Sequence, residues 1–99
     1  MKYLTDEILL GAIERLGSEA FDSHALLQDL MTHHPHDYVR ELNEKIRTED
    51  PILQTHSDIA SQLNFAPLSA VVENLGQVSS LNVRGKRTTV HKWRRRKTA

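Results

Sequence analysis

The chain has no cysteine, few aromatic residues and no long apolar run. The absence of cysteine excludes a disulfide scaffold, a thiol nucleophile and a thiolate-ligated metal centre. The longest apolar run, at residues 8–13, is interrupted by Gly11 and falls far short of the roughly 20 residues that span a bilayer. Asp6 and Glu7 stand where a signal peptide carries positive charge, so we expect a cytoplasmic protein without a membrane segment.

The remaining composition is that of a folded domain. Apolar residues make up 38% of the chain and charged residues 26%, which argues against a disordered segment. A chain of 99 residues can bury roughly 60–70% of its unfolded surface. We therefore expect a single domain over residues 1–99.

Opposite charges are separated along the sequence, although the formal net charge is zero. Residues 1–73 hold all thirteen acidic residues and only five basic ones, a charge of −8. Residues 74–99 hold the other eight basic residues, a charge of +8. Such a basic end is typical of proteins that contact a polyanion. The alternative is that this end folds back on the acidic part of the chain.

Three amphipathic helices are predicted in the first half, at residues 5–16, 22–34 and 35–47. Their apolar residues recur at the three- and four-residue spacing of one helix face. Gly17 ends the first helix, because glycine readily adopts the left-handed conformation. Pro35 ends the second, because the residue before a proline is steered away from helical angles.

Two shorter helices are predicted next. Pro51 interrupts the helical pattern, and residues 52–54 are expected to be extended. Thr55, followed three residues later by an acidic residue, predicts a helix start, and this helix would run to residue 64. Pro67 begins a fifth predicted helix, 67–75, whose apolar residues recur at helical spacing.

The chain then favours a β-hairpin. Strand-forming residues predict strands at 77–83 and 88–93 around a basic turn at 84–87. Trp93 is expected to pack in the core, and the alternative is that it stacks on a base of single-stranded nucleic acid. Residues 94–99 form a basic tail.

The order of these elements resembles a winged helix-turn-helix domain. The segment 55–64 looks like the first helix of the helix-turn-helix pair, with Ala60 where the two helices cross. In that pattern Ile59 and Leu63 lie in the core. The segment 67–75 would be the recognition helix, and the hairpin would be the wing.

The resemblance implies a mostly helical α+β fold with a small C-terminal β-hairpin. Residues 36–93 would form the winged-helix-like core. Within it, residues 36–47 would be the first helix and 52–54 the short first strand. Residues 1–34 would be a two-helix N-terminal extension, and residues 94–99 a basic tail.

The same resemblance implies binding to duplex DNA, as in a small transcriptional regulator or a mobile-element accessory protein. The recognition helix would enter a groove while wing cations contact phosphates. Because that helix exposes no Arg or Lys, the wing and tail would supply most of the affinity. The implied contact residues come from the helix face, the wing and the tail: Ser69, Glu73, Asn74, Arg84, Lys86, Arg87, Lys92, Arg94, Arg95, Arg96 and Lys97.

Other partners stay open at this point. The same fold can bind RNA or serve as a protein–protein interaction module with no nucleic-acid activity. Apolar residues near the start of the chain, including Tyr3, Leu4 and Leu10, are candidates for a homodimer interface.

We expect neither an enzyme nor a metal or cofactor site. Consecutive residues on a helix point about 100° apart. His33 and His34 therefore do not converge on one metal ion, and the His-Ser-Asp sequence at 56–58 cannot form a catalytic relay.

Overall fold

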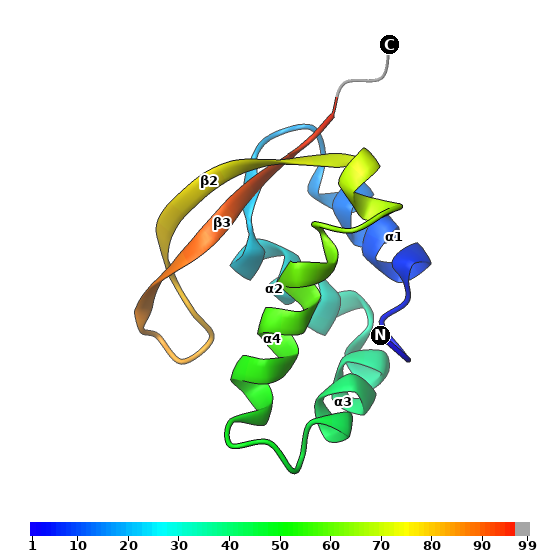
Figure 1. Cartoon of the computed structure of the whole chain (residues 1–99), viewed down its shortest axis with the longest axis vertical. Helices are drawn as coiled ribbons and strands as arrows, with labels where there is room; N and C mark the ends of the chain where they lie inside the picture. The colour runs from blue at the N-terminus through cyan, green and yellow to red at the C-terminus, as the bar shows by residue number, and fades with distance from the viewer. Residues whose placement is uncertain (97–99) are drawn as a thin grey trace.

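Four α-helices and a three-stranded antiparallel sheet make up residues 1–96, the part of the chain that the computed structural model describes (Figure 1). The predicted α+β class is confirmed. The elements, in chain order, are α1 Asp6–Leu16, β1 Phe21–Asp22, α2 Ser23–His33, α3 Pro35–Glu44, α4 Pro51–Gln62, the 3-10 turn η1 Leu68–Ala70, β2 Val72–Leu81 and β3 Arg87–Arg95.

The first three predicted helices are confirmed to within a few residues. The Thr5 side chain caps α1 by accepting a hydrogen bond from the Ile8 amide. The Asp22 carboxylate caps α2 by accepting one from the Ala25 amide, at 2.9 Å. Pro35 occupies the first turn of α3, where its fixed φ suits a helix and its missing N–H costs nothing.

Helix α4 begins earlier than predicted. The expected extended segment at 52–54 is wrong, because these residues lie in the first turn of α4. The Asp50 carboxylate caps the helix by accepting from the Leu53 amide at 3.2 Å, and Pro51 takes the first helical position. Asp-Pro therefore starts a helix here, and Thr55 lies inside it rather than at its cap.

Thr55 is buried in α4, and among the described residues its hydroxyl group has no hydrogen-bond partner. Burying an unpaired hydroxyl costs free energy, whereas valine has nearly the same shape and no polar atom. We expect Thr55→Val to raise the free energy of unfolding by about 1 kcal/mol. Urea unfolding followed by circular dichroism measures the change, and Thr55→Ser, which keeps the hydroxyl and opens a small cavity, should destabilise instead.

The fifth predicted helix, 67–75, is wrong. Only the single turn η1 forms there, and β2 starts at Val72. The apolar spacing has another cause: Leu68 and Val72 enter the core from a turn and a strand, while Leu75 is 42% exposed. Leu75 is the extra residue of a β-bulge between Asn74 and Gly76, and Gly76 has φ = 101°.

The hairpin is confirmed, and it is longer than predicted. Strand β3 pairs along its length with β2 and, on its other side, with the short strand β1, which gives the order β1-β3-β2. The sequence analysis missed β1. In Figure 1 the twisted hairpin crosses the helical layer, and its loop approaches the start of α4.

Trp93 packs in the core, as predicted, with 1% of its surface exposed. Its indole N–H donates a hydrogen bond to Ser23 Oγ at 3.0 Å, which joins β3 to the start of α2. The core combines residues 1–34 with the rest of the chain: Leu4, Leu9, Ala12, Ile13, Phe21, Leu26, Leu27 and Leu30 surround Ile59, Leu63, Leu68, Val72 and Trp93. Leu4, a candidate for a homodimer interface, lies in this core.

A buried carboxylate fixes the start of the chain. Glu41 on α3 is 3% exposed, and its Oε1 accepts hydrogen bonds from the amides of Tyr3 and Leu4, the latter at 2.9 Å. The pair of bonds places the Leu4 side chain in the core.

We expect Glu41→Ala to lower the free energy of unfolding by about 1–3 kcal/mol, because it leaves two amides without an acceptor. Glu41→Gln keeps an acceptor oxygen in the same place and should recover most of the loss. Chemical denaturation of both variants provides the comparison. Equal losses would show that the charge, and not the two hydrogen bonds, matters.

None of the helices within residues 1–96 has the length and apolarity that a membrane crossing requires.

Candidate functional site

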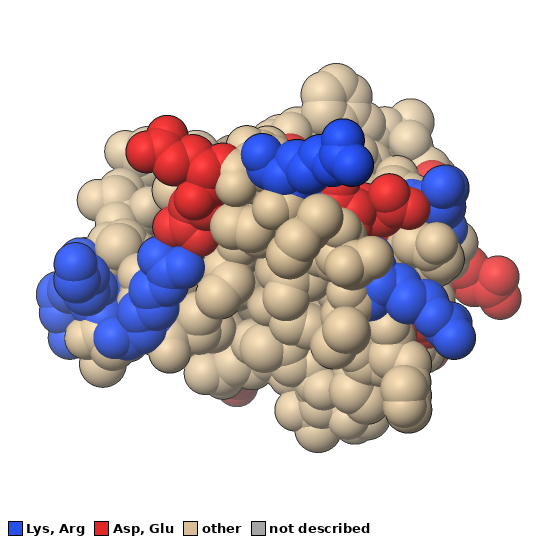
Figure 2. Space-filling view, turned by 90° about the horizontal axis from the view of Figure 1, so that it is seen from below, with Lys and Arg blue, Asp and Glu red and all other residues tan. Residues whose placement is uncertain are grey.

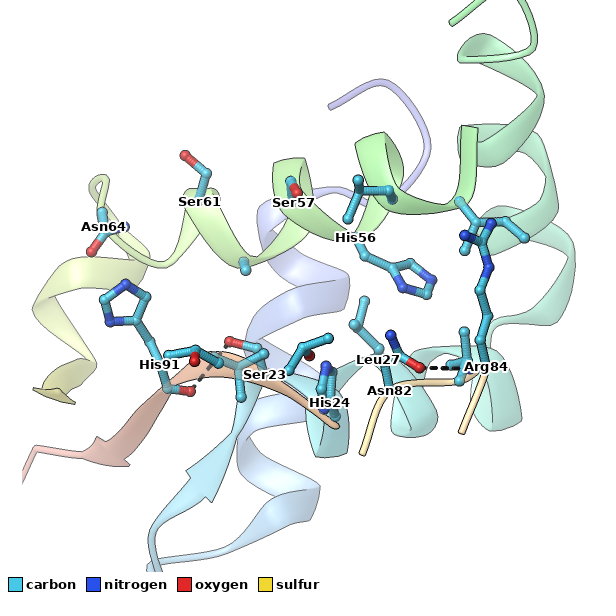
Figure 3. A pocket seen from close by; sticks show the side chains of 17 residues that line it. Ser23, His24, Leu27, His56, Ser57, Ser61, Asn64, Asn82, Arg84 and His91 are labelled. Carbon is cyan, nitrogen blue, oxygen red and sulfur yellow. Dashed lines mark hydrogen bonds between the residues drawn. The ribbon is translucent and has the colours of Figure 1, made fainter. Parts of the chain in front are cut away.

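A groove of about 420 Å³ lies between α4, the start of α2 and the hairpin. Figure 3 shows α4 along one side of the groove, with α2 and β3 opposite it. Much of the wall is apolar and comes from three elements: Leu27, Ile52, Leu53, Ala60, Val83 and Val90. The groove therefore exists because the hairpin folds back over the helices instead of projecting into solvent.

The hairpin loop is held in one conformation by Asn82. Its Oδ1 accepts hydrogen bonds from the amides of Arg84 and Lys86, at 2.9 and 3.0 Å. Gly85, at φ = 76°, supplies the left-handed residue that this tight loop needs. The loop consequently directs the Arg84 side chain back toward α4.

Arg84 and Asp50 join the hairpin loop to the start of α4. Arg84 Nη1 and Nη2 each donate a hydrogen bond to one oxygen of the Asp50 carboxylate, both at 2.8 Å. This is the bidentate geometry that suits an arginine–carboxylate pair. The Arg84 hydrogen bond, followed by that of the Leu53 amide, lowers the pKa of Asp50 to about 2. The predicted contact residue Arg84 is therefore engaged within the protein.

We expect the Asp50 carboxyl group to titrate near pH 2, and in Arg84→Ala to titrate closer to its ordinary 3.8. Since folding depresses this pKa, the stability that the carboxylate contributes is complete above pH 3.8 and is lost as the pH falls through about 2. Carbon-13 NMR of the carboxyl carbon in both proteins measures the two midpoints. A midpoint unchanged by Arg84→Ala would contradict the ion pair.

His56 carries an uncharged imidazole in the groove. Its Nε2 lies 2.6 Å from the Tyr38 hydroxyl oxygen. Burial lowers the pKa of His56, with a smaller contribution from His24, and burial raises the pKa of Tyr38. At neutral pH the Tyr38 hydroxyl is thus protonated and His56 is uncharged. In the tautomer in which the hydroxyl donates to Nε2, the single ring proton of His56 is on Nδ1.

Three predicted contact residues do not share a helix face, because the predicted recognition helix does not form. Ser69 lies in η1, and its carbonyl oxygen accepts from Arg96 Nε at 3.1 Å. Glu73 and Asn74 lie on β2. Glu73 accepts two hydrogen bonds from Arg94, which lower its pKa, and Asn74 contacts the ring of His91.

The predicted basic residues of the hairpin divide into two groups. Arg84, Arg94 and Arg96 each lie within 4.0 Å of a carboxylate. Within residues 1–96, no carboxylate lies that close to the other four, which we call the free hairpin cations: Lys86, Arg87, Lys92 and Arg95. Figure 2, a view from below, shows Lys and Arg side chains gathered at the left, where the hairpin lies. The predicted contact Lys97 falls outside the described residues.

An uncharged polar stripe runs along the exposed side of α4 and just beyond its end. It consists of Gln54, Ser57, Ser61 and Asn64, which are all exposed and recur at intervals of three and four residues. The stripe is not apparent from a helix predicted to begin at Thr55, since its first residue, Gln54, then lies outside the helix. The regular spacing of these polar residues was the available signal.

The histidines near the end of α2 lie close to carboxylates three or four residues away in the sequence. His33 lies 3.6 Å from Asp29, and His34 lies 3.6 Å from Asp37. Throughout the described part of the chain, no three His, Asp or Glu side chains are close enough together to hold a metal ion.

A scan of protein-family models finds no match to this chain, and searches of curated proteins and of solved structures find no significant match.

Proposed function

We propose that this protein binds duplex DNA through the basic hairpin, with helix α4 facing a groove of the duplex. One observation carries the proposal: within residues 1–96 the free hairpin cations have no carboxylate partner, although the chain contains as many acidic as basic residues. These cations are spread along the hairpin, from its loop to the end of β3. Cations left without a partner are suited to phosphates, which supply most of the affinity in DNA binding.

The order of the elements supports a winged-helix arrangement in a different register from the one that the sequence predicts. In this proposal α1 is the first helix, β1 the first strand and α4 the recognition helix, with β2–β3 as the wing. Residues 1–34 then belong to the domain itself. A small DNA-binding transcriptional regulator or a mobile-element accessory protein would use such a domain.

The stripe on α4 supplies groups that can face bases. Amide side chains such as those of Asn64 and Gln54 recognise adenine, and Gln54 would do so by exchanging the hydrogen bond from its Nε2 to Asp58, at 2.9 Å, for one to the base. The hydroxyls of Ser57 and Ser61 can pair with several base edges. The acidic residue beside the stripe, Asp58, is 3.1 Å from Lys45, so its charge is compensated. The free hairpin cations would contact the phosphates that flank this groove.

Fluorescence anisotropy of a labelled random-sequence duplex tests the proposal. If four cations contact phosphates, the logarithm of the binding constant should fall against the logarithm of salt concentration with a slope of about −3 to −4. Between about 50 and 200 mM salt the affinity should drop roughly 100-fold. No binding at the lower salt concentration would overturn the proposal, and equal binding to a labelled single-stranded RNA would redirect it to RNA.

A second candidate is a protein–protein interaction module of the same fold. Exposed apolar side chains on the hairpin loop and its neighbours favour it: Leu53 is 62% exposed, Leu81 54% and Val83 45%. This candidate predicts a complex that resists high salt and no binding to the duplex. Sedimentation of the protein alone also reports whether these side chains mediate a homodimer.

A further inference from the structure

The groove between α4 and the hairpin has the size and lining of a small-molecule site. Its volume, about 420 Å³, lies within the range of ligand pockets. Apolar side chains from α2, α4 and the hairpin line it on opposite sides, represented by Leu27, Ala60 and Val90. Such walls favour an apolar body, such as an aromatic ring.

Polar side chains also line the groove, including the hydroxyls of Ser57 and Ser61, and two nitrogen donors reach it from opposite sides. His56 offers Nδ1–H as a donor in the tautomer in which Nε2 accepts from the Tyr38 hydroxyl, and the proposal takes this tautomer. Asn82 uses Oδ1 to hold the hairpin loop, and within residues 1–96 its Nδ2 donates to no other group. Figure 3 shows His56 reaching into the groove from α4 and Asn82 from the hairpin loop. Donors without acceptors in an apolar groove match a ligand oxygen.

The charge at this end of the groove is already balanced. The Asp50 carboxylate accepts hydrogen bonds from both Nη1 and Nη2 of Arg84, each at 2.8 Å. An anionic ligand would have to displace Asp50 from Arg84, and a cationic ligand would lose hydration without gaining a free carboxylate. A neutral ligand avoids both costs.

We propose that this groove binds an uncharged small molecule that joins an apolar, ring-sized body to a carbonyl-type oxygen. The oxygen accepts hydrogen bonds from His56 and Asn82, and the body lies between α4 and β3. The groove shares Ser57, Ser61 and Asn64 with the polar stripe of α4 but none of the free hairpin cations. Ligand binding is measured without DNA, so the inference does not depend on DNA binding.

Three probes with the same ring and different charge test the site on the full chain: acetophenone, benzoate and benzylamine. Acetophenone should shift the amide signals of Ala60, Val83 and Val90 in proton–nitrogen NMR spectra along one saturating curve. Its dissociation constant should be in the millimolar range, as expected for a fragment of this size. Benzoate and benzylamine should each bind at least about 5-fold more weakly, because their charges find no free counter-charge.

Two variants locate the binding. Ala60→Leu fills the groove and should abolish the saturating shifts, whereas Ala70→Leu, an equal change at an exposed residue outside the groove, should leave them intact. Asn82→Asp keeps the oxygen that accepts from Arg84 and Lys86 but removes the Nδ2 donor. It should weaken acetophenone binding at least about 5-fold, and it serves as the test if Ala60→Leu does not fold.

The proposal is overturned if acetophenone produces no saturating shifts in these residues, or if Ala60→Leu folds and binds as well as the unmodified protein. If benzoate binds as tightly as acetophenone, the ligand is not restricted to uncharged molecules, and the groove is assigned to anions. Unchanged binding by Asn82→Asp would remove the hydrogen-bonded oxygen from the proposal.

Discussion

Replacing Lys86, Arg87, Lys92 and Arg95 together with alanine is expected to weaken duplex binding at least about 100-fold at low salt and to reduce the salt slope by about 3 to 4. The reason is that each of these side chains would otherwise release a counterion from a phosphate. Anisotropy titrations at several salt concentrations give both quantities. The melting temperature should stay nearly unchanged, because none of the four forms an ion pair within residues 1–96.

A matched control separates a local effect from a change in net charge. The replacement of Lys2, Arg15, Arg40 and Arg47 with alanine removes the same charge from the first half of the chain, outside the hairpin and α4. This control should retain most of the affinity and the salt slope. If both quadruple variants lose affinity equally, the protein attracts DNA by its overall charge and the hairpin is not the contact surface.

The substitution Trp93→Ala is expected to lower the free energy of unfolding by about 3–5 kcal/mol. The side chain is fully enclosed and belongs to the central strand of the sheet, so its removal leaves a large cavity between the sheet and the helices. A domain of this size is stabilised by about 5–15 kcal/mol, so much of the population could unfold at physiological temperature. Urea unfolding followed by circular dichroism measures the loss, since the variant has no tryptophan fluorescence.

Two further variants divide that effect into its parts. Trp93→Phe keeps most of the apolar volume and loses only the N–H bond to Ser23, so it should cost clearly less. Leu81→Ala removes an apolar side chain that is 54% exposed and should have a small effect. A loss below about 1 kcal/mol in Trp93→Ala would contradict a core position for this residue.

The helical half of the fold could be predicted from local sequence, because its signals are local. Thr5, Asp22 and Pro35 mark helix starts by chemistry that acts within three or four residues. The two-residue strand β1 could not be predicted this way. Phe21 and Asp22 become a strand only by pairing with Trp93 and Lys92, seventy positions further along the chain.

The errors between residues 50 and 75 have a common physical origin. Asp50–Pro51 is equally consistent with a helix end and a helix start, and the choice depends on the capping bond to the Leu53 amide. The apolar residues at 68–75 match helical spacing, but Val72 pairs with Arg95 across the hairpin. Tertiary pairing overrides local periodicity there.

The candidate site was predictable only in part. The excess of positive charge on the hairpin is visible in the sequence, and all the basic residues except Lys97 can be placed in the structure. The sequence does not show which of these residues lack a carboxylate partner, because the ion pairs Arg84–Asp50 and Arg94–Glu73 form only when the chain folds. The groove was not predicted, because its walls come from α2, α4 and the hairpin, which are distant in sequence.

The strand order β1-β3-β2 gives the protein an exposed sheet edge along β2. Backbone amides and carbonyls on such an edge can pair with a strand of another molecule, which is a common route to aggregation. The bulge at Leu75 interrupts this edge and twists it next to Gly76. On β2, residues 77–81 are the part of this edge that stays regular, and a foreign strand that docked there would find five residues with which to pair.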